Sequence, residues 1–521
     1  MNRFSYILLY GALVTALAGF YAGGGNGGVV ADRPPAGDAG SAAASTEYPR
    51  LDVRADCGAV GDGVANDTAA FQEAARRIQE AGGGTLVIPP GTYHVGRQDH
   101  TPGRYPYYQA APIFRVQGVK FLHIEGRGST LRLAPGLRFG SFDKDTGEPY
   151  HPPAMPFVDH QYAAYVGHML HISNSENIVI QDLELDGNIG ELIIGGQFGD
   201  TGRQLPSCGI FLHNNKNATI ERVHSHHHAL DGIMIGWYGL KEGDPAVPHT
   251  LVDCVLEYNG RQGLSWIGGR GLTARRCKFR HTGRALHGAA AFASAPGAGL
   301  DIEAEDSICR DGLFEDCEFV NNVGCGMVAD SGDGGYSRFV RCLFQGVTNW
   351  SAWSAKPGLV FEDCTFHGSI VHAFGSDDPA LATRWVRCTF EDRPWEDGRS
   401  PYGNFLAELN GNLKNVTFTD CVFTANRCRG MWCSGESFRL IDCEFTYRFA
   451  ELPPGQFQTI LRGGEITGCH FREEFPDSSE ARWSIIVDGS RVGRGKPTVV
   501  DGPRVRWGGT QGPVGVITPS E

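Results

Sequence analysis

Apolar and polar residues alternate along most of the chain in a short repeated pattern. The segments VDCVL, RRCKF, EDCEF, VRCLF, EDCTF, VRCTF, TDCVF, IDCEF and TGCHF place a cysteine at one recurring position, mostly every 22 to 26 residues. In most segments the cysteine and the apolar residue two places later alternate with polar residues, which is typical of a strand with one buried face. A repeat of this length predicts one coil of a parallel β-helix.

The residue before the repeated position gives an independent check on the register, because its charge alternates from one repeat to the next. These residues are Asp182, Arg222, Asp253, Arg276, Asp316, Arg341, Asp363, Arg387 and Asp420, before Asp442 breaks the order. Equivalent positions of successive coils lie about 4.8 Å apart, where opposite charges attract and like charges repel. The alternation therefore predicts that these residues are neighbours in a column.

The register also predicts that the repeated cysteines point inward and fill the coil as small apolar residues. A disulfide framework is the alternative for a secreted protein with 15 cysteines. Outside the repeat, Cys428 and Cys433 are close enough in sequence to form a pair.

The N-terminal region differs from the repeats. Residues 1–18 combine Arg3, an apolar run and a small-residue site, which predicts a secretory signal, with an uncleaved anchor as the alternative. Residues 19–47 are rich in Gly, Ala, Pro and Asp and predict a flexible linker. We expect a secreted or periplasmic protein, without stable membrane insertion after signal cleavage.

A helical period comes next, just before the first coil. Residues 66–68 offer N-cap side chains, Phe71, Ala75 and Ile78 fall on one face, and three glycines at 82–84 end the pattern. An amphipathic helix in this place predicts a cap over the open end of a solenoid. We therefore expect a cap and first strands at 48–96, coils with inserted loops at 97–471, and a last rung with a tail at 472–521.

Composition and charge fit this picture. The 72 glycines among 521 residues supply the tight turns of a coiled sheet. The formal net charge of -13 disfavours nucleic acid and anionic membrane surfaces as partners.

Two stretches between Gly58 and Val95, GAVGDGVANDTAAFQ and GGGTLVIPPGTYHV, carry a family resemblance. They resemble the N-terminal signature of the pectate lyase superfamily, a group of right-handed parallel β-helices that includes rhamnogalacturonase-like and epimerase-like proteins and phage tailspikes. The resemblance implies an all-β, right-handed parallel β-helix with secreted activity toward a polysaccharide. It does not specify the reaction.

Three carboxylates are the strongest candidates for chemistry. Alternation in the second strand of each coil, aligned on four glycines, sends Asp301, Glu303 and Asp330 outward. Residues two apart on a strand are about 7 Å apart, and Asp330 is expected about 5 Å from Glu303 on the next coil. Like charges at such distances raise at least one pKa and keep one carboxyl protonated as a general acid. We predict that these three residues are catalytic; a solvated acidic edge and a calcium site are the alternatives.

A second group lies on the preceding strands. The register stacks Glu184 on His224 and places Asp186, His226, Glu257 and Arg280 in one column. A histidine between carboxylates can transfer protons near neutral pH, and an arginine can neutralise an acidic sugar, so we assign His226, Glu257 and Arg280 to substrate binding. Charge complementation between coils is the alternative.

Metal binding by the run His226-His227-His228 is not expected, because consecutive residues on a strand point to opposite faces. Two further residues complete the predicted substrate-binding set. Asp231, in ALDGIMI, resembles the position at which polygalacturonases carry a catalytic aspartate, although the other motifs of that family are absent. Trp237 ends the same strand.

The first functional hypothesis is a glycosidase that cleaves a polysaccharide and requires no cofactor. A polysaccharide lyase of the same fold, using Arg or Lys as base and often Ca²⁺, is the alternative. The other class is a non-catalytic module that binds glycan.

Overall fold

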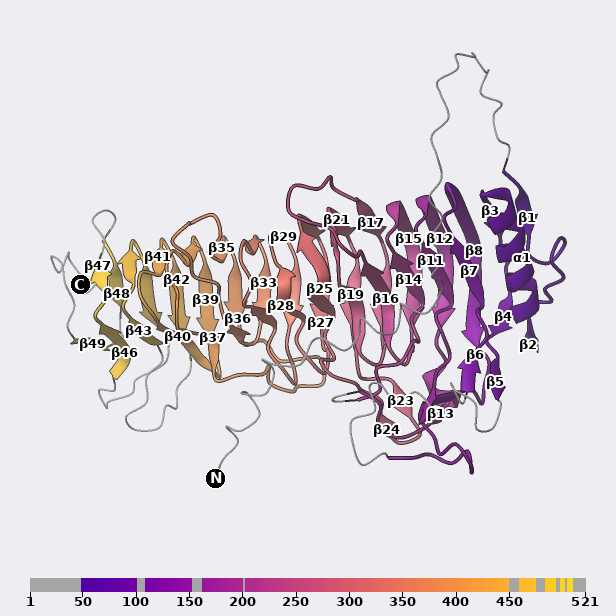
Figure 1. Cartoon of the computed structure of the whole chain (residues 1–521). Coiled ribbons are helices and arrows are strands. Elements are labelled where there is room, and N and C mark those ends of the chain that lie inside the picture. The colour runs from indigo at the N-terminus through magenta and orange to yellow at the C-terminus, as the bar shows by residue number, and fades with distance from the viewer. Residues whose placement is uncertain are drawn as a thin grey trace, which may run out of the picture.

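The chain winds into an elongated solenoid of parallel strands (Figure 1). The computed structural model describes residues 48–100, 108–151, 162–199, 202–448, 459–474, 483–492, 497–501 and 504–508. The predicted signal at 1–18 and linker at 19–47 lie outside these residues. Among the described residues, no helix combines the length and apolar character needed to cross a membrane.

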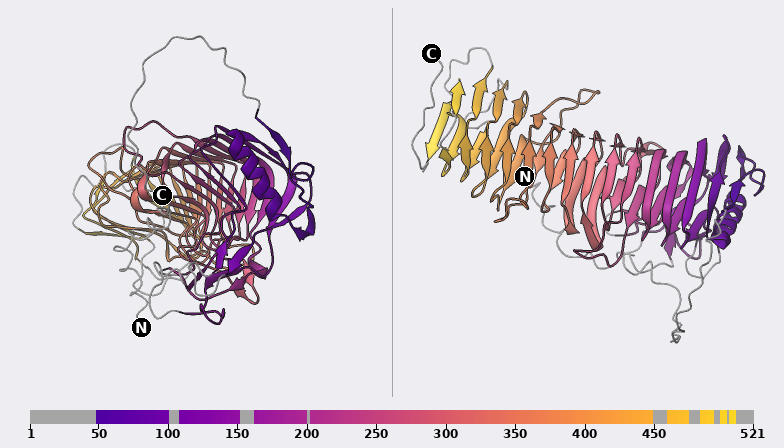
Figure 2. Two further views of the ribbon diagram at one scale, coloured as in Figure 1. Left: turned by 45° about the vertical axis from the view of Figure 1, so that its right-hand side comes forward. Right: turned by 90° about the horizontal axis from the view of Figure 1, so that it is seen from above.

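Each coil contributes three strands, and each strand pairs in parallel with its equivalent in the next coil. One coil consists of β17 (His249–Val252), β18 (Val255–Glu257) and β19 (Gln262–Trp266). These pair with β21 (Leu272–Arg275), β22 (Lys278–Arg280) and β25 (Leu300–Arg310) respectively. In the left panel of Figure 2 the successive coils lie behind one another, which shows the axis of the solenoid.

The later coils repeat this order. Their strands are β26 (Gly312–Glu315), β27 (Glu318–Val320), β28 (Met327–Gly334); β29 (Ser337–Val340), β30 (Leu343–Gln345), β31 (Ala352–Ser354); β32 (Val360–Glu362), β33 (Thr365–His367), β34 (Ile370–Val371); β35 (Arg384–Val386), β36 (Thr389–Glu391), β37 (Phe405–Asn410); β38 (Thr417–Thr419), β39 (Val422–Ala425), β40 (Arg429–Ser434); β41 (Arg439–Ile441), β42 (Glu444–Tyr447), β43 (Thr459–Arg462); β44 (Glu465–Thr467), β45 (His470–Glu473), β46 (Trp483–Asp488); β47 (Arg491–Val492), β48 (Val499–Asp501) and β49 (Arg504–Gly508).

In the earlier coils one long strand runs through the first corner and serves both of the first two sheets. These long strands are β8 (Phe121–Leu133), β12 (Glu176–Asp186) and β15 (Lys216–His226). The strands of the same coils in the third sheet are β7 (Phe114–Gln117), β11 (Leu170–Ser173), β14 (Ile210–His213) and β16 (Asp231–Gly236). The sheet that contains β8, β12 and β15 is extended by four N-terminal strands, β1 (Arg50–Asp52), β2 (Asp62–Asn66), β3 (Gly83–Val87) and β4 (Thr92–Val95).

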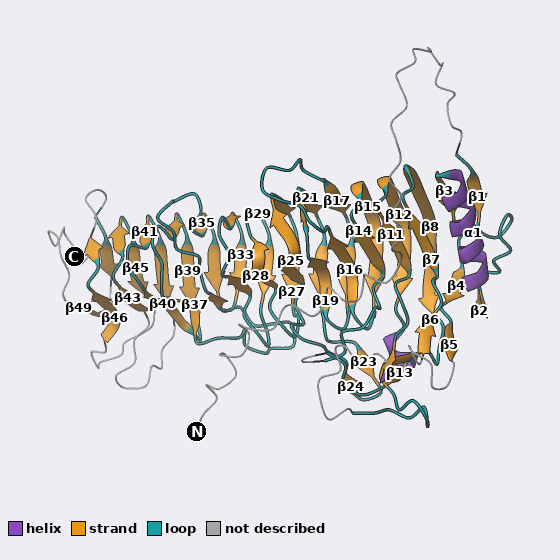
Figure 3. Cartoon of the chain, viewed as in Figure 1, coloured by secondary structure: helices purple, strands orange, loops and turns teal. Residues whose placement is uncertain are grey.

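Insertions add small side structures. These are β5 (Gln98–His100), β6 (Tyr108–Ala110), β9 (Arg138–Ser141), β10 (Ala163–Ala164), η3 (Ile189–Glu191), β13 (Ile193–Ile194), β20 (Gly269–Arg270), β23 (Leu286–His287) and β24 (Ala290–Ala291). Loops gather along the edge of the solenoid that also carries β13, β23 and β24 (Figure 3).

The alternating charges lie at the first corner of each coil. Each of these residues has a positive φ, for example 55° at Asp182 and 51° at Arg222, so the chain turns there between two strands. Each arginine forms a bidentate ion pair with the aspartate of the preceding coil, as Arg341 does with Asp316 at 2.8 and 2.9 Å. The pairs Arg222–Asp182, Arg276–Asp253 and Arg387–Asp363 follow the same rule. The predicted column is confirmed.

The core includes stacked columns of identical side chains. All nine repeated cysteines are buried with free thiols. The thiol of Cys317 donates to the carbonyl oxygens of Glu315 and Ala274 at 3.3 and 3.5 Å, so it satisfies backbone groups that the corner turns inward. Beside it, Phe279, Phe319 and Phe344 stack with ring centroids 5.0 and 4.8 Å apart. Cys428 and Cys433 are also free.

The single α-helix of the described residues is α1 (Thr68–Ala81). It buries Phe71, Ala75 and Ile78 in the core and ends at Gly82, whose φ of 72° allows the left-handed turn. It packs against β3 and β7 at the N-terminal end of the solenoid (Figure 1). That it protects this end of the core from water stays a prediction.

Candidate active site

The carboxylate cluster lies on the outer face of the sheet formed by β16, β19, β25 and β28. The inward residues of these strands are fully buried, as predicted, and they are Ile233, Leu264, Leu300 and Met327. The aligned glycines permit close approach of neighbouring coils: a Cβ on Gly299 would lie 2.7 Å from the carbonyl oxygen of Gly326. A side chain at position 299 would therefore force apart the strand that carries Asp301 and the next coil.

Asp301 points outward but is only 5% exposed. Its Oδ2 accepts a hydrogen bond from Nε2 of Gln262 at 2.6 Å, and Oε1 of Gln262 accepts one from the backbone nitrogen of Ala298 at 3.0 Å. Burial raises the pKa of Asp301 well above its ordinary value, and the nearby charges of Glu303 and Asp330 raise it further. Asp301 is thus a carboxyl that stays protonated where ordinary aspartates are ionised.

Glu303 and Asp330 are both partly exposed, but they do not stack directly. The register shifts between Asp301 and Glu303, so that Asp301 pairs with Val328 whereas Glu303 pairs with Ser331. The predicted direct stacking of Asp330 on Glu303 is therefore wrong, because a bulge interrupts the alternation on which it depended. The hydroxyl of Ser331 donates to Oδ1 of Asp330 at 2.9 Å.

Asp231 belongs to the same face, but it is completely buried. Nε and Nη2 of Arg261 donate to its two carboxylate oxygens at 2.9 and 2.6 Å, and the hydroxyl of Ser265 donates at 3.0 Å. Burial disfavours the charge of Arg261, but Asp231 outweighs this effect and the pKa of Arg261 is raised. Asp231 therefore holds Arg261, whose charge also interacts with Glu303. The substrate-binding role predicted for Asp231 stays a prediction.

Aromatic side chains from the next coils lie beside the carboxylates. Trp353 is the register partner of Val328, which itself pairs with Asp301. Trp353 contacts Trp350 and His372 with ring centroids 5.2 and 4.8 Å apart, and Trp350 contacts the 41%-exposed Tyr402. These rings form a partly exposed aromatic group next to the acid cluster.

The second predicted group lies across the corner, on β12, β15, β18 and β22. The predicted register is confirmed, because Glu184 pairs with His224, Asp186 with His226, His226 with Glu257, and Glu257 with Arg280. The contacts are diagonal as well as vertical: Nε2 of His226 lies 3.0 Å from Glu184, and Nε2 of His224 lies 3.0 Å from Glu257.

Two carboxylates of this second group, Glu184 and Glu257, have lowered pKa values. Burial acts to raise the pKa of Glu257, but hydrogen bonds from His224 and Arg280 outweigh it and lower the pKa to about 2. The pKa of Glu184 is also lowered, because bonds from Thr130 and His226 overcome its burial. This group presents anionic oxygens next to imidazoles.

Strand alternation predicted that His227 points away from His226, but the two side chains face each other. Its φ of 56° turns the chain at this residue, and the Nδ1 atoms of the two rings lie 2.7 Å apart. The same corner position in the next two coils carries Tyr258 and His281, and the rings of His227, Tyr258 and His281 stack at 5.2 and 4.8 Å. Trp395, from the loop after β36, contacts His281 edge-on at 6.0 Å.

Trp237 is partly buried and packs against the cluster of Leu240, Val247 and Ile308. It follows β16 directly. Its role in substrate binding stays a prediction.

Two features of the site lie outside the repeated pattern of the sequence. Arg261 lies in the turn between β18 and β19, where no repeated charge marks it. Trp350 and Tyr402 belong to loops between strands, outside the repeat. A signal for Arg261 was present in the segment NGRQG, residues 259–263, where a single arginine stands beside the glycine of the next strand. In the preceding coil the equivalent segment carries Asp231.

Two family models match the chain. The description "Right handed beta helix region" covers residues 167–446, more than half of the chain. "Rhamnogalacturonase A/epimerase, pectate lyase-like" covers residues 52–98 and confirms the resemblance of the N-terminal segment.

Among curated proteins, the chain is 28% identical over 211 residues to mannuronan C5-epimerase AlgE6 of Azotobacter vinelandii. The match covers 40% of this chain and 19% of that protein, so the chain spans about a fifth of its relative.

Similar solved structures include the A-module of Azotobacter vinelandii mannuronan C-5 epimerase AlgE4, at 16% identity and a TM-score of 0.39, covering 90% of this chain and 100% of that one. A tailspike protein of E. coli bacteriophage HK620 in complex with a pentasaccharide matches at 12% identity and a TM-score of 0.40, covering 87% of this chain and 71% of that one.

Proposed function

Because the chain belongs to the right-handed β-helix family, we propose that it is a carbohydrate-active enzyme that cleaves glycosidic bonds in a polysaccharide. The observation that carries the proposal is the environment of Asp301. Asp301 is a buried carboxyl with a raised pKa, and the partly exposed Glu303 lies two residues away on the same strand. A proton-donating carboxyl with a second carboxyl group beside it is the pair that glycoside hydrolysis uses.

In this proposal Asp301 protonates the glycosidic oxygen as the general acid. Glu303 acts as base or nucleophile, and Asp330 helps to keep Asp301 protonated through its charge. Arg261, held by Asp231, lies where its charge acts on Glu303. The Trp350, Trp353 and Tyr402 rings offer apolar faces for sugar rings.

The test is turnover of a polysaccharide panel, scored for new reducing ends. Asp301→Asn is expected to lower turnover by roughly 10²- to 10⁴-fold, the usual contribution of a general acid. The matched control is Asp333→Asn on the neighbouring strand β28, because Asp333 is exposed and paired with Arg310. Equal turnover of wild type and Asp301→Asn would remove the proposed acid.

Proton abstraction beside a uronate carboxylate is the second candidate. It is supported by the 28% identity to a protein named as a mannuronan C5-epimerase. An unsaturated uronide product would indicate elimination, and a changed uronate configuration without chain cleavage would indicate epimerisation. Glu303 and Asp330 offer the oxygen ligands that Ca²⁺ prefers, so a lyase activity is expected to fall on chelation.

The wild-type protein alone distinguishes a non-catalytic glycan-binding module from both enzyme activities. Such a module would bind a polysaccharide and form none of these products. Secretion is part of the proposal and rests on residues 1–18. N-terminal sequencing of exported protein is expected to begin near residue 19.

A further inference from the structure

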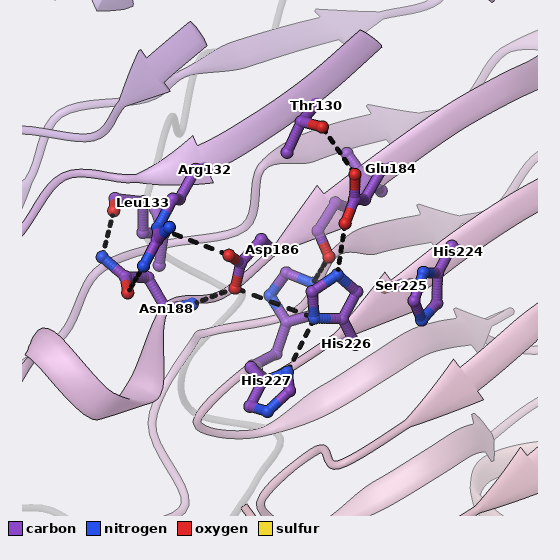
Figure 4. A network of polar contacts seen from close by, with 12 residues as sticks. Thr130, Arg132, Leu133, Glu184, Asp186, Asn188, His224, Ser225, His226 and His227 are labelled. Atoms are coloured by element: carbon purple, nitrogen blue, oxygen red, sulfur yellow. Dashed lines mark hydrogen bonds and ion pairs between the residues drawn. The ribbon is translucent and has the colours of Figure 1, made fainter. Parts of the chain in front are cut away.

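The corner at His227 brings five potential metal ligands to one place on the outer face of the second sheet. Glu184 and Asp186 lie on β12, and His224 and His226 lie on the same face of β15. His227 joins them because its positive φ redirects the chain. Figure 4 shows His226 directed toward Glu184, Asp186 and His227, with His224 beside it.

Three of these side chains meet the first requirement of a metal site. One ligand atom from each of Glu184, His224 and His226 lies within 4.8 Å of the other two. The rings of His224 and His226 are 4.2 Å apart between centroids, and Nε2 of His226 is 3.0 Å from Oε1 of Glu184. Glu184 and His224 are 41% and 39% exposed, so a cation can enter from solvent.

Each of the three ligands is also oriented by a neighbour. Oε1 of Glu257 faces Nε2 of His224 at 3.0 Å, and Arg280 holds the other oxygen of Glu257 at 2.8 Å. A carboxylate that accepts the proton of one ring nitrogen leaves the lone pair on the other, which is the usual arrangement behind a ligating histidine.

The other two ligands are held in the same manner. His227 faces Nδ1 of His226 at 2.7 Å, so Nδ1 can carry the proton while Nε2, on the side of Glu184, keeps its lone pair. The hydroxyl of Thr130 donates to Oε2 of Glu184 at 2.5 Å and leaves Oε1 for a cation.

We propose that Glu184, His224 and His226 bind a divalent transition metal ion of the Zn²⁺ class. Two imidazoles and one carboxylate match the ligands of such ions, whereas Ca²⁺ and Mg²⁺ prefer oxygen ligands alone. Three protein ligands at a partly exposed surface leave a coordination position for water or a substrate oxygen.

A matched pair elsewhere on the same sheet separates metal binding from simple charge complementation. Nε2 of His367 on β33 lies 2.9 Å from Oε1 of Glu391 on β36, in the equivalent column of later coils. This pair lacks a second histidine on its strand, so it is a contact between one imidazole and one carboxylate. His367→Gln is therefore the control for any general effect of losing a histidine–glutamate contact.

The experiment titrates Zn²⁺ into tag-free, chelator-treated protein whose accessible thiols have been alkylated, with a chromophoric chelator as competitor. Wild type is expected to bind one equivalent, and His224→Gln and His226→Gln are expected to bind it at least about 10-fold more weakly. Glu257→Gln, which changes only the orienting group, is expected to weaken binding by about 10- to 100-fold. His367→Gln is expected to match wild type.

Absence of Zn²⁺ binding by wild type, or equal binding by wild type and His224→Gln, overturns the proposal. So does equal binding of Ca²⁺. His224 is exposed enough that its replacement leaves the fold intact, which circular dichroism verifies, so the test does not depend on the more buried His226. A rise in melting temperature on adding Zn²⁺, absent in His224→Gln, is an independent readout.

Discussion

The two clusters on either side of the His227 corner use similar residues in opposite electrostatic settings. Beyond the corner, Asp231 is fully buried with Arg261, and Asp301 has a raised pKa. Before the corner, the pKa values of Glu184 and Glu257 are lowered. Hydrogen bonds from Thr130 and His226 outweigh the partial burial of Glu184, and those from His224 and Arg280 outweigh that of Glu257. The neighbours of a carboxylate and its access to solvent therefore decide whether it can donate a proton or hold a cation.

The largest expected effect comes from breaking the buried pair. Arg261→Met leaves Asp231 buried without its cation, and we expect a loss of about 3–5 kcal/mol in the free energy of unfolding. Urea denaturation followed by circular dichroism measures it. The double variant Asp231→Asn with Arg261→Met removes both charges and is expected to recover part of the loss; a single variant as stable as wild type would show that the pair is not buried.

The next effect concerns Asp301 and pH. Its folded pKa is raised, first by burial and then by Glu303 and Asp330, whereas an aspartate in the unfolded chain titrates near 3.9. Between these two values the folded protein holds the proton and the unfolded chain does not. The free energy of unfolding therefore falls as pH rises, by up to about 1.4 kcal/mol per pH unit.

Asp301→Asn lacks this titration, so its stability relative to wild type is expected to increase with pH through that window. Denaturation curves of both proteins at several pH values measure the difference, with Asp333→Asn as the control that should follow wild type. Parallel pH dependence of wild type and Asp301→Asn would contradict the raised pKa. If Asp301 is the general acid, turnover should also fall as pH rises through the same folded pKa.

The regular part of this molecule could be predicted from the sequence because each coil places the same kinds of residue at equivalent positions. Cysteine, phenylalanine and alternating charge recur at fixed places, so a single register accounts for the buried columns and for ion pairs such as Arg341–Asp316. The vertical order of Glu184 and His224, and that of His226 and Glu257, followed from the same register.

The remainder depended on local departures from that repeat. Strand alternation places side chains correctly only while the strand is continuous, so it failed at the bulge opposite Glu303 and at the positive φ of His227. The contact between Asp231 and Arg261 depends on how one turn places Arg261. The aromatic group at Trp350 depends on how the loops between strands run. No period in the sequence encodes those paths.

The smallest expected effect on stability comes from Arg280→Met, which changes the more solvated cluster in the way that Arg261→Met changes the buried one. Arg280→Met removes the cation beside Glu257, but Arg280 is 30% exposed and Glu257 keeps its contact with His224. Because a partly solvated pair contributes little, we expect a loss below about 1 kcal/mol in the same urea denaturation. A loss as large as that of Arg261→Met would mean that the two clusters are equally desolvated, and the distinction between a proton-donating and a cation-binding cluster would then fail.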